Sequence, residues 1–141
     1  MMGKAKAISQ IRALVKECSE PGWDGDGANP LTSRTADLVI QFIRVLPDKL
    51  ALPEFAIEPD GSIALDWIHS RNRLFSLSIG TSKRLAYTWL DGTDKGHAVG
   101  RFDENNISPK IVQGISAIMS HENVAVGFGD ASPMPSPTIT R

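Results

Sequence analysis

The stretch of residues 55–102 constrains the fold most, because apolar and polar residues alternate there in short runs. Residues 62–68, 74–79 and 85–90 each place a bulky apolar side chain at every second position. Side chains two apart share one face of a β-strand, so this pattern is typical of strands with one buried face. Residues 55–58 and 96–102 predict two weaker strands. The apolar positions of the three clear runs are Ile63, Leu65, Trp67, Phe75, Leu77, Ile79, Leu85, Tyr87 and Trp89.

Turn-forming residues separate these runs. Asp60-Gly61 and Asp91-Gly92 each contain a glycine, which adopts positive φ without steric cost. We expect a two-residue hairpin loop at Asp60-Gly61 and a second turn at Asp91-Gly92. Arg71-Asn72 lies in the loop between the second and third strands. The strands are therefore expected to be antiparallel and to follow one another as a meander.

Three segments outside this stretch have the periodicity of amphipathic helices. The first covers residues 4–18, and the second begins near Thr32 or Ser33 and stops before Pro47. The third begins at Ser108-Pro109, where serine caps the helix and proline occupies its first turn, and it ends near His121. Their buried positions are Ile8, Ile11, Leu14, Val15, Ala36, Val39, Ile40, Ile43, Ile111, Val112, Ile115, Ile118 and Met119.

The element order predicts an α+β fold in which helices cover one face of a four- to five-stranded antiparallel sheet. Two helices precede the sheet and one follows it. We expect residues 1–127 to form a single domain, since 141 residues suit one core better than two. Residues 128–141, with Pro133, Pro135 and Pro137 among Ser and Thr, are expected to be a flexible tail.

The charge balance and the cysteine count exclude several functional classes. Fifteen Lys and Arg against sixteen Asp and Glu give a net charge of -1, so no overall field attracts nucleic acid or an anionic membrane. A single cysteine, Cys18, excludes an intramolecular disulfide and multi-cysteine metal sites. The N-terminal residues resemble neither a secretory signal nor a membrane anchor, so we expect neither there. We expect a soluble, cytoplasmic protein with no membrane partner.

The seven residues from Gly22 to Ala28 form a corner with three glycines, two carboxylates and one aromatic side chain. Asp24 and Asp26 have the alternation that begins an EF-hand, but the later ligand positions lack carboxylates, so we expect no calcium site. The two aspartates are expected to accept backbone N–H bonds that hold the turn. Trp23 is interpreted as an anchor against the core, with ligand stacking as the alternative.

Three aromatic residues, Trp67, Tyr87 and Trp89, fall on one face of the predicted sheet. Basic residues stand near the ends of the same strands: Arg71, Arg73, Lys83 and Arg84. An aromatic face beside basic side chains is typical of some single-strand nucleic-acid binders. The alternative is that the helices cover this face and that the aromatic pairs stabilise the sheet.

No catalytic motif is complete. Pro59-Asp60 begins a restriction-type nuclease motif, but its second half, Asp66-Trp67-Ile68, lacks the lysine that the motif requires. Asp91-Gly92-Thr93 lacks the nucleophilic aspartate of the phosphatase loop that it matches. The three histidines, His69, His97 and His121, are dispersed. A small hydrolase centred on Asp24, Asp26 and a histidine remains an alternative, and we expect no cofactor and no metal.

With these motifs in place, the chain resembles a group of short bacterial proteins. The resemblance rests on Gly22-Trp23-Asp24-Gly25-Asp26-Gly27-Ala28, on Leu46-Pro47, and on Glu58-Pro59-Asp60-Gly61-Ser62-Ile63 leading to Asp66-Trp67. It covers residues 8–119. It implies a bacterial cytoplasmic origin, among mobile or defence-related genes, and supplies no catalytic residues to carry over.

These features together favour a non-enzymatic protein-binding module of the antitoxin, inhibitor or defence-accessory type. It is expected to dock a surface of the sheet or the proline-containing tail onto a protein partner. Nucleic acid is the alternative partner, and an edge strand can also pair with another copy of the chain. The candidate binding residues are Trp23, Asp24, Asp26, Trp67, Arg71, Tyr87 and Trp89.

Overall fold

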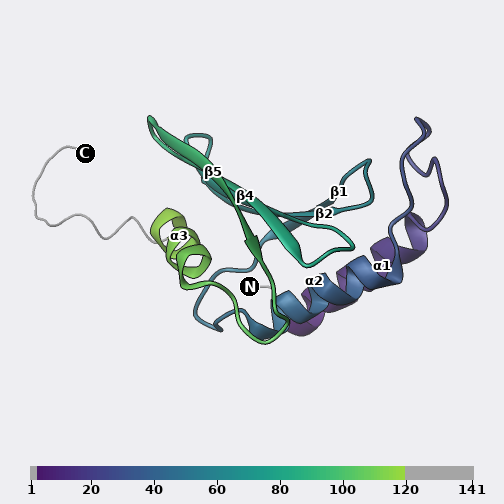
Figure 1. Cartoon of the computed structure of the whole chain (residues 1–141), viewed down its shortest axis with the longest axis horizontal. Coiled ribbons are helices and arrows are strands. Elements are labelled where there is room, and N and C mark those ends of the chain that lie inside the picture. Colours follow the sequence, from purple (N-terminus) through teal and green to yellow (C-terminus); the bar gives the residue numbers. More distant parts are fainter. Residues whose placement is uncertain (1–2, 120–141) are drawn as a thin grey trace, which may run out of the picture.

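A computed structural model describes residues 3–119, which form three helices and one five-stranded sheet (Figure 1). The predicted α+β class is confirmed. Two helices precede the five strands and a third helix follows them. In chain order the elements are α1 (Lys4–Glu17), α2 (Ser33–Val45), β1 (Glu54–Ile57), β2 (Ile63–Ser70), β3 (Arg73–Ile79), β4 (Arg84–Asp91), β5 (Asp94–Arg101) and α3 (Pro109–Met119).

The strands form an antiparallel meander in the order β1-β2-β3-β4-β5. The alternation in the sequence sets this register. The row of paired residues Trp67, Phe75 and Trp89 lies on one face, and its neighbours Ile68, Leu74 and Leu90 lie on the other. The last strand is longer than the sequence predicted, since β5 has eight residues and pairs with β4 along its whole length.

The prediction of a two-residue loop at Asp60-Gly61 is wrong, because the β1–β2 loop contains three residues. The backbone N–H of Glu58 donates to the Ser62 carbonyl at 2.9 Å, which leaves residues 59–61 between the paired positions. Gly61 adopts a φ of 89° as the third loop residue. This conformation is typical of a type I turn followed by a left-handed residue. The Ser62 hydroxyl and, to a lesser extent, the Ser62 backbone N–H donate hydrogen bonds to the Asp60 carboxylate, and these bonds lower the pKa of that carboxyl.

The helix boundaries follow local signals in the sequence. Thr32 caps α2, since its hydroxyl accepts a hydrogen bond from the Thr35 backbone N–H at 3.2 Å. The helix ends just before Leu46-Pro47, as predicted, because proline restricts the residue in front of it. Ser108 caps the start of α3, where its hydroxyl accepts from the Lys110 N–H.

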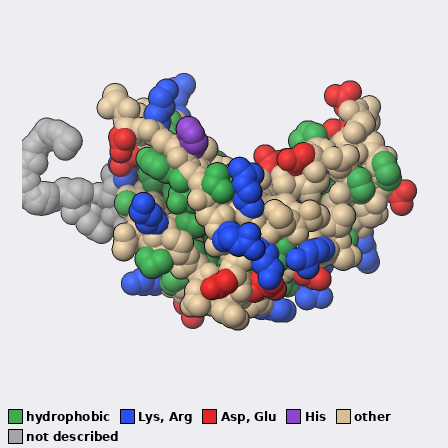
Figure 2. Space-filling model, viewed as in Figure 1, with side chains coloured by type: hydrophobic (Ala, Val, Ile, Leu, Met, Phe, Trp, Pro, Cys, Tyr) green, Lys and Arg blue, Asp and Glu red, His purple; other side chains and the backbone are tan. Residues whose placement is uncertain are grey.

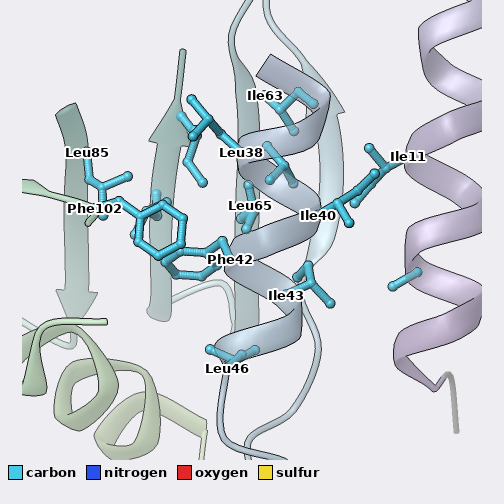
Figure 3. Close-up of a cluster of buried hydrophobic side chains, with 14 of the residues drawn as sticks. Ile11, Leu38, Ile40, Phe42, Ile43, Leu46, Ile63, Leu65, Leu85 and Phe102 are labelled. Atoms are coloured by element: carbon cyan, nitrogen blue, oxygen red, sulfur yellow. The ribbon is translucent and has the colours of Figure 1, made fainter. Parts of the chain in front are cut away.

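All three helices lie on one side of the sheet (Figure 1). Both α2 and α3 pack against β2 and β3, and α1 packs against α2. Figure 3 shows α2 between the sheet and α1, with Phe42 and Leu38 facing the strands. The largest buried side chains include Phe42, Phe102, Leu65 and Trp67. The core therefore forms between the sheet and a partial helical layer.

Two regions of the sheet lie outside the packing of α2 and α3 on β2 and β3. They are strands β4 and β5 on the helix side, and the whole opposite face. Neither α2 nor α3 has its main packing on β4 or β5, which lie beyond the part of the sheet that both helices cover. The opposite face of the sheet carries no helix among residues 3–119 (Figure 1). Ile68 and Val99 on that face are 48% and 55% exposed.

Several sequence predictions fall outside the described residues. They are the domain boundary at residue 127, the tail of residues 128–141 and the position of His121. Within residues 3–119, no helix is both long and apolar enough to cross a membrane.

Candidate functional site

A groove runs between α3 and strands β4 and β5 on the helix side of the sheet. Its volume is about 450 Å³, and Phe75, Tyr87 and Trp89 form its aromatic wall. On the opposite wall Lys110, Gln113, Gly114 and Ala117 succeed one another along one face of α3. This volume is within the range of pockets that bind ligands. Figure 2 shows hydrophobic side chains gathered at this end of the molecule, with acidic and basic side chains around them.

The aromatic wall is continuous across three strands. Phe75 stacks on Tyr87 with ring centroids 5.6 Å apart, and Tyr87 lies 6.2 Å from Trp89. Phe75 and Tyr87 are buried, whereas Trp89 is half-buried. Stacked and tilted aromatic pairs of this kind fix one another's orientation. The groove therefore has a rigid apolar side with Trp89 as its most accessible member.

Glycine at position 96 determines where Trp89 lies. Gly96 is the cross-strand partner of Trp89, and a methyl group on Gly96 would overlap the indole ring. The ring can therefore lie over β5, the edge strand. The other β5 residues on this face are Ala98 and Gly100, which are also small. Small side chains on β5 leave the groove open, and no helix of residues 3–119 covers it.

An ion pair closes one end of the groove. Arg73 and Asp91 face each other on β3 and β4 and form a salt bridge. The Nη2 atom of Arg73 also donates to the Ala117 carbonyl at 2.8 Å and to the Ile118 carbonyl at 3.4 Å. Arg73 thus satisfies carbonyl groups near the α3 C-terminus, where a cation also interacts favourably with the helix dipole. This clamp holds α3 against the sheet.

Two further charged residues line the groove, and neither forms an ion pair within residues 3–119. Asp94 begins β5 next to Asp91, and Lys110 is in the first turn of α3. The C-terminal end of α3 is at the Asp91 side because Arg73 bridges the two. Lys110 therefore lies toward the other end, about 12 Å along the helix from Ile118 at 1.5 Å per residue. The groove is acidic at one end and basic at the other.

The groove opens along an unpaired strand edge. Only β4 pairs with β5 in the described part of the chain. Hydrogen-bonded and non-hydrogen-bonded pairs alternate in an antiparallel ladder. The Phe102 N–H donates to the Lys83 carbonyl, so every second residue before Phe102 on β5 directs its backbone N–H and C=O groups toward β4. By this alternation Lys95, His97 and Val99 direct their backbone N–H and C=O groups away from β4. The edge next to the groove therefore presents free backbone donors and acceptors.

The corner of residues 22–28 is organised by hydrogen bonds within the loop. The Asp24 carboxylate accepts from the backbone N–H groups of Asp26 at 2.8 Å and Ala28 at 3.2 Å. Trp23 is half-buried against the core, and its Nε1 donates to the Asn29 carbonyl at 2.7 Å. The expected turn role is confirmed for Asp24. Asp26 is exposed, and within residues 3–119 its side chain accepts no such bond.

Asp24 and Asp26 offer a matched test of this structural role. We expect Asp24→Ala to lower the free energy of unfolding by about 1–2 kcal/mol, because two backbone donors lose their acceptor. Asp26→Ala should change it by less than about 0.5 kcal/mol, as is usual for an exposed side chain that accepts no hydrogen bond within residues 3–119. Urea unfolding measures both. Equal effects of the two substitutions would contradict the assignment.

The structure places the other candidate residues in different environments. Trp67 is 1% exposed, and its Nε1 donates to the Ala51 carbonyl at 2.8 Å, so it is a core residue. Arg71 is exposed in the β2–β3 loop. Tyr87 and Trp89 line the groove. Of the seven candidates, the groove therefore contains only these two.

The aromatic and basic residues of the predicted sheet face do not form one accessible surface. Helices cover Trp67, and the Arg73 guanidinium is bound to Asp91 and to α3. Lys83 pairs with Glu104 at 2.8 Å, which lowers the pKa of that carboxyl. Arg84 is next to Leu85, which faces the helices, so the Arg84 side chain lies on the opposite face of the sheet, beside its cross-strand neighbour Arg101.

The residues of the hydrolase alternative are also separated. The corner with Asp24 and Asp26 lies in the α1–α2 connection, at the opposite end of the molecule from the tip of the β4–β5 hairpin (Figure 1). His97 is on the uncovered face of β5, and His69 is near the end of β2. Within residues 3–119, no group of three His, Cys, Asp or Glu residues is arranged to hold a metal ion. Cys18 is buried, and burial raises the pKa of its thiol.

Sequence reasoning missed most of the groove. Phe75 was assigned to the core face, but Asp94, Gly96, Ala98 and Lys110 were not singled out. The available signal was the run of small residues at alternate positions of β5, opposite a strand with Tyr87 and Trp89. Because α3 lies over β2 and β3, it leaves these small β5 residues open. No local sequence pattern predicts that position of α3. Comparison with known protein families, curated proteins and solved structures finds no match for this chain.

Proposed function

We propose that this chain is a non-enzymatic protein-binding module that takes an extended segment of a partner protein along the edge of β5. The observation that carries the proposal is the position of the aromatic groove directly beside an unpaired edge strand. A segment that pairs with β5 would gain backbone hydrogen bonds. Every second side chain of that segment would face the groove. Recognition by strand addition combines affinity and specificity in this way.

The edge of β5 has the properties that strand addition requires. The strand contains eight residues and no proline, so its outward-facing backbone groups form a regular row. On the uncovered face the edge carries Lys95, His97 and Arg101. Charged side chains on an edge oppose unspecific pairing between strands. They also favour a partner strand with acidic residues on that face, since like charges directly opposite one another are destabilising.

The chemistry of the groove suits binding better than catalysis. Its wall is aromatic, its Asp91 carboxylate is held in a salt bridge with Arg73, and its lining within residues 3–119 includes no cysteine, serine or histidine. Such a site lacks a nucleophile beside a base, which group-transfer chemistry needs. The biological class we propose is an antitoxin, inhibitor or defence-accessory protein of the bacterial cytoplasm. That class rests on the resemblance carried by the corner and hairpin motifs.

Substitution of Val99 tests the proposed edge. Val99→Pro removes one backbone N–H that faces away from β4, so the ladder between β4 and β5 keeps its hydrogen bonds. We expect this variant to weaken partner binding about tenfold, the size of one lost hydrogen bond with local distortion. Val99→Thr keeps the N–H and serves as the control. The readout is the amount of one stoichiometric protein that copurifies from the native host, with and without nuclease.

Three outcomes are distinguishable. Capture by wild type and Val99→Thr, with loss in Val99→Pro, supports docking along β5. Equal capture by a folded Val99→Pro variant would contradict it. Nuclease-sensitive capture, or recovery of nucleic acid alone, would instead support the nucleic-acid alternative.

A further inference from the structure

The charges and side-chain sizes along the groove specify which partner segment fits. Three alternate residues of β5 face the groove on the helix side, namely Asp94, Gly96 and Ala98. A strand added to β5 would lie about 4.7–4.9 Å from it and place its own side chains beside these positions. Each position offers a different environment. The following inference rests on the proposed function, because it assumes that a segment pairs with β5.

The first position is acidic. The Asp94 side chain is exposed and forms no ion pair among residues 3–119. Its cross-strand neighbour Asp91 is already bound to Arg73, so Asp94 supplies the uncompensated charge at this end. A basic side chain opposite Asp94 would pair with it. An acidic side chain would be repelled by both carboxylates.

The second position is apolar. Gly96 has no side chain, and the Trp89 indole lies over it. A partner side chain opposite Gly96 would therefore meet the edge of an aromatic ring and the open volume of the groove. An aliphatic or aromatic side chain would bury apolar surface there, at about 25 cal/mol per Å² removed from water. A glycine or a charged residue would lose that contribution.

The third position is under the influence of Lys110. Ala98 and Lys110 line the same groove from opposite sides, and Lys110 has no ion-pair partner in the described part of the chain. It is also in the first turn of α3, whose N-terminus attracts negative charge. The small Ala98 side chain leaves room for a longer one opposite it. An acidic side chain at this position would satisfy the Lys110 ammonium group.

We propose that the segment bound at β5 carries a basic, an apolar and an acidic side chain at alternate positions i, i+2 and i+4, opposite Asp94, Gly96 and Ala98 respectively, so that it runs parallel to β5. Four residues of a strand span about 13 Å, similar to the roughly 12 Å of α3 between Lys110 and Ile118, whose carbonyl binds Arg73 beside Asp91. The two charges also determine which way the segment runs. A segment with its acidic residue first would bind in the opposite direction along the edge.

Capped peptides of matched length test this proposal on the full-length protein. The first probe is acetyl-Thr-Lys-Thr-Phe-Thr-Glu-Thr-amide, and the reference probe has glutamine in place of both lysine and glutamate. Binding is followed by the NMR shift of the Trp89 indole N–H, assigned with a Trp89→Phe variant. We expect the charged peptide to bind about tenfold more tightly than the neutral one, as two exposed ion pairs would give.

Variants of the protein locate the effect. Asp94→Asn and Lys110→Gln should each weaken binding of the charged peptide about threefold and leave binding of the neutral peptide unchanged. Asp26→Asn changes an exposed carboxylate in the corner, away from the groove, and is the matched control. Equal affinity for both peptides, equal behaviour of the three variants, or no Trp89 shift with either peptide would each overturn the inference. The Val99→Pro comparison would remain valid in every case, so the proposed function stands or falls separately.

Discussion

Replacing Trp67 by alanine is expected to lower the free energy of unfolding by about 3–5 kcal/mol, the usual cost of removing a buried aromatic side chain. Trp67 is 1% exposed and packs edge-on against Phe75 with ring centroids 6.0 Å apart. Its indole N–H donates to the Ala51 carbonyl, which would lose this partner. The substitution therefore leaves both a cavity and an unsatisfied acceptor. Urea unfolding followed by circular dichroism measures the change.

Two further substitutions make this result interpretable. Ile68→Ala changes the next residue of the same strand, whose side chain is 48% exposed, and should cost less than about 1 kcal/mol. Trp67→Phe keeps most of the volume and removes the hydrogen bond, so it should cost about 1–3 kcal/mol and still fold. A mild effect of Trp67→Ala, comparable with that of Ile68→Ala, would show that helices do not cover this face of the sheet.

Gly114→Ala is expected to destabilise the protein by up to about 2 kcal/mol, although alanine is the better helix former. Helix propensity alone would favour alanine by about 1 kcal/mol. The added Cβ, however, would lie 2.7 Å from Cε2 of the buried Phe75 ring. Overpacking of this kind costs about 1–3 kcal/mol, because α3 or the ring must shift. The sign of the effect thus tests how closely α3 approaches the sheet.

A double-mutant cycle separates this contact from other effects of the substitution. Phe75→Leu shortens the side chain at the point of overlap, so Gly114→Ala should be less harmful in that background. Gln113→Ala, at an exposed neighbouring position of α3, should leave the stability nearly unchanged. If Gly114→Ala stabilised the protein and the cycle showed no coupling, α3 would not be seated on Phe75.

Most of the fold could be predicted from local patterns in the sequence. The alternation of Leu85, Tyr87 and Trp89 fixes which face of β4 is buried, because side chains two apart must point the same way. Thr32 and Pro47 mark the limits of α2 through their own hydrogen-bonding chemistry and ring geometry. The β1–β2 loop length could not be predicted this way, since a glycine with positive φ suits loops of two or three residues.

The candidate site was less predictable because it depends on contacts between distant elements. Trp67 and Trp89 have the same alternation in the sequence, yet one lies under the helices and the other lines the groove. The difference arises from where α3 lies, and Arg73 helps to fix this through bonds to α3 carbonyls 44 and 45 residues away. No local pattern encodes such a contact. The corner, in contrast, was interpreted correctly for Asp24 because its bonds are local.

The affinity of the captured partner for three forms of the protein tests the central claim most directly. Titration calorimetry with wild type, Val99→Thr and Val99→Pro compares the same strand with and without one outward-facing N–H. Docking along β5 predicts similar dissociation constants for wild type and Val99→Thr, and a dissociation constant about tenfold higher for Val99→Pro. The same dissociation constant for all three folded proteins would show that the partner binds elsewhere and would contradict the account.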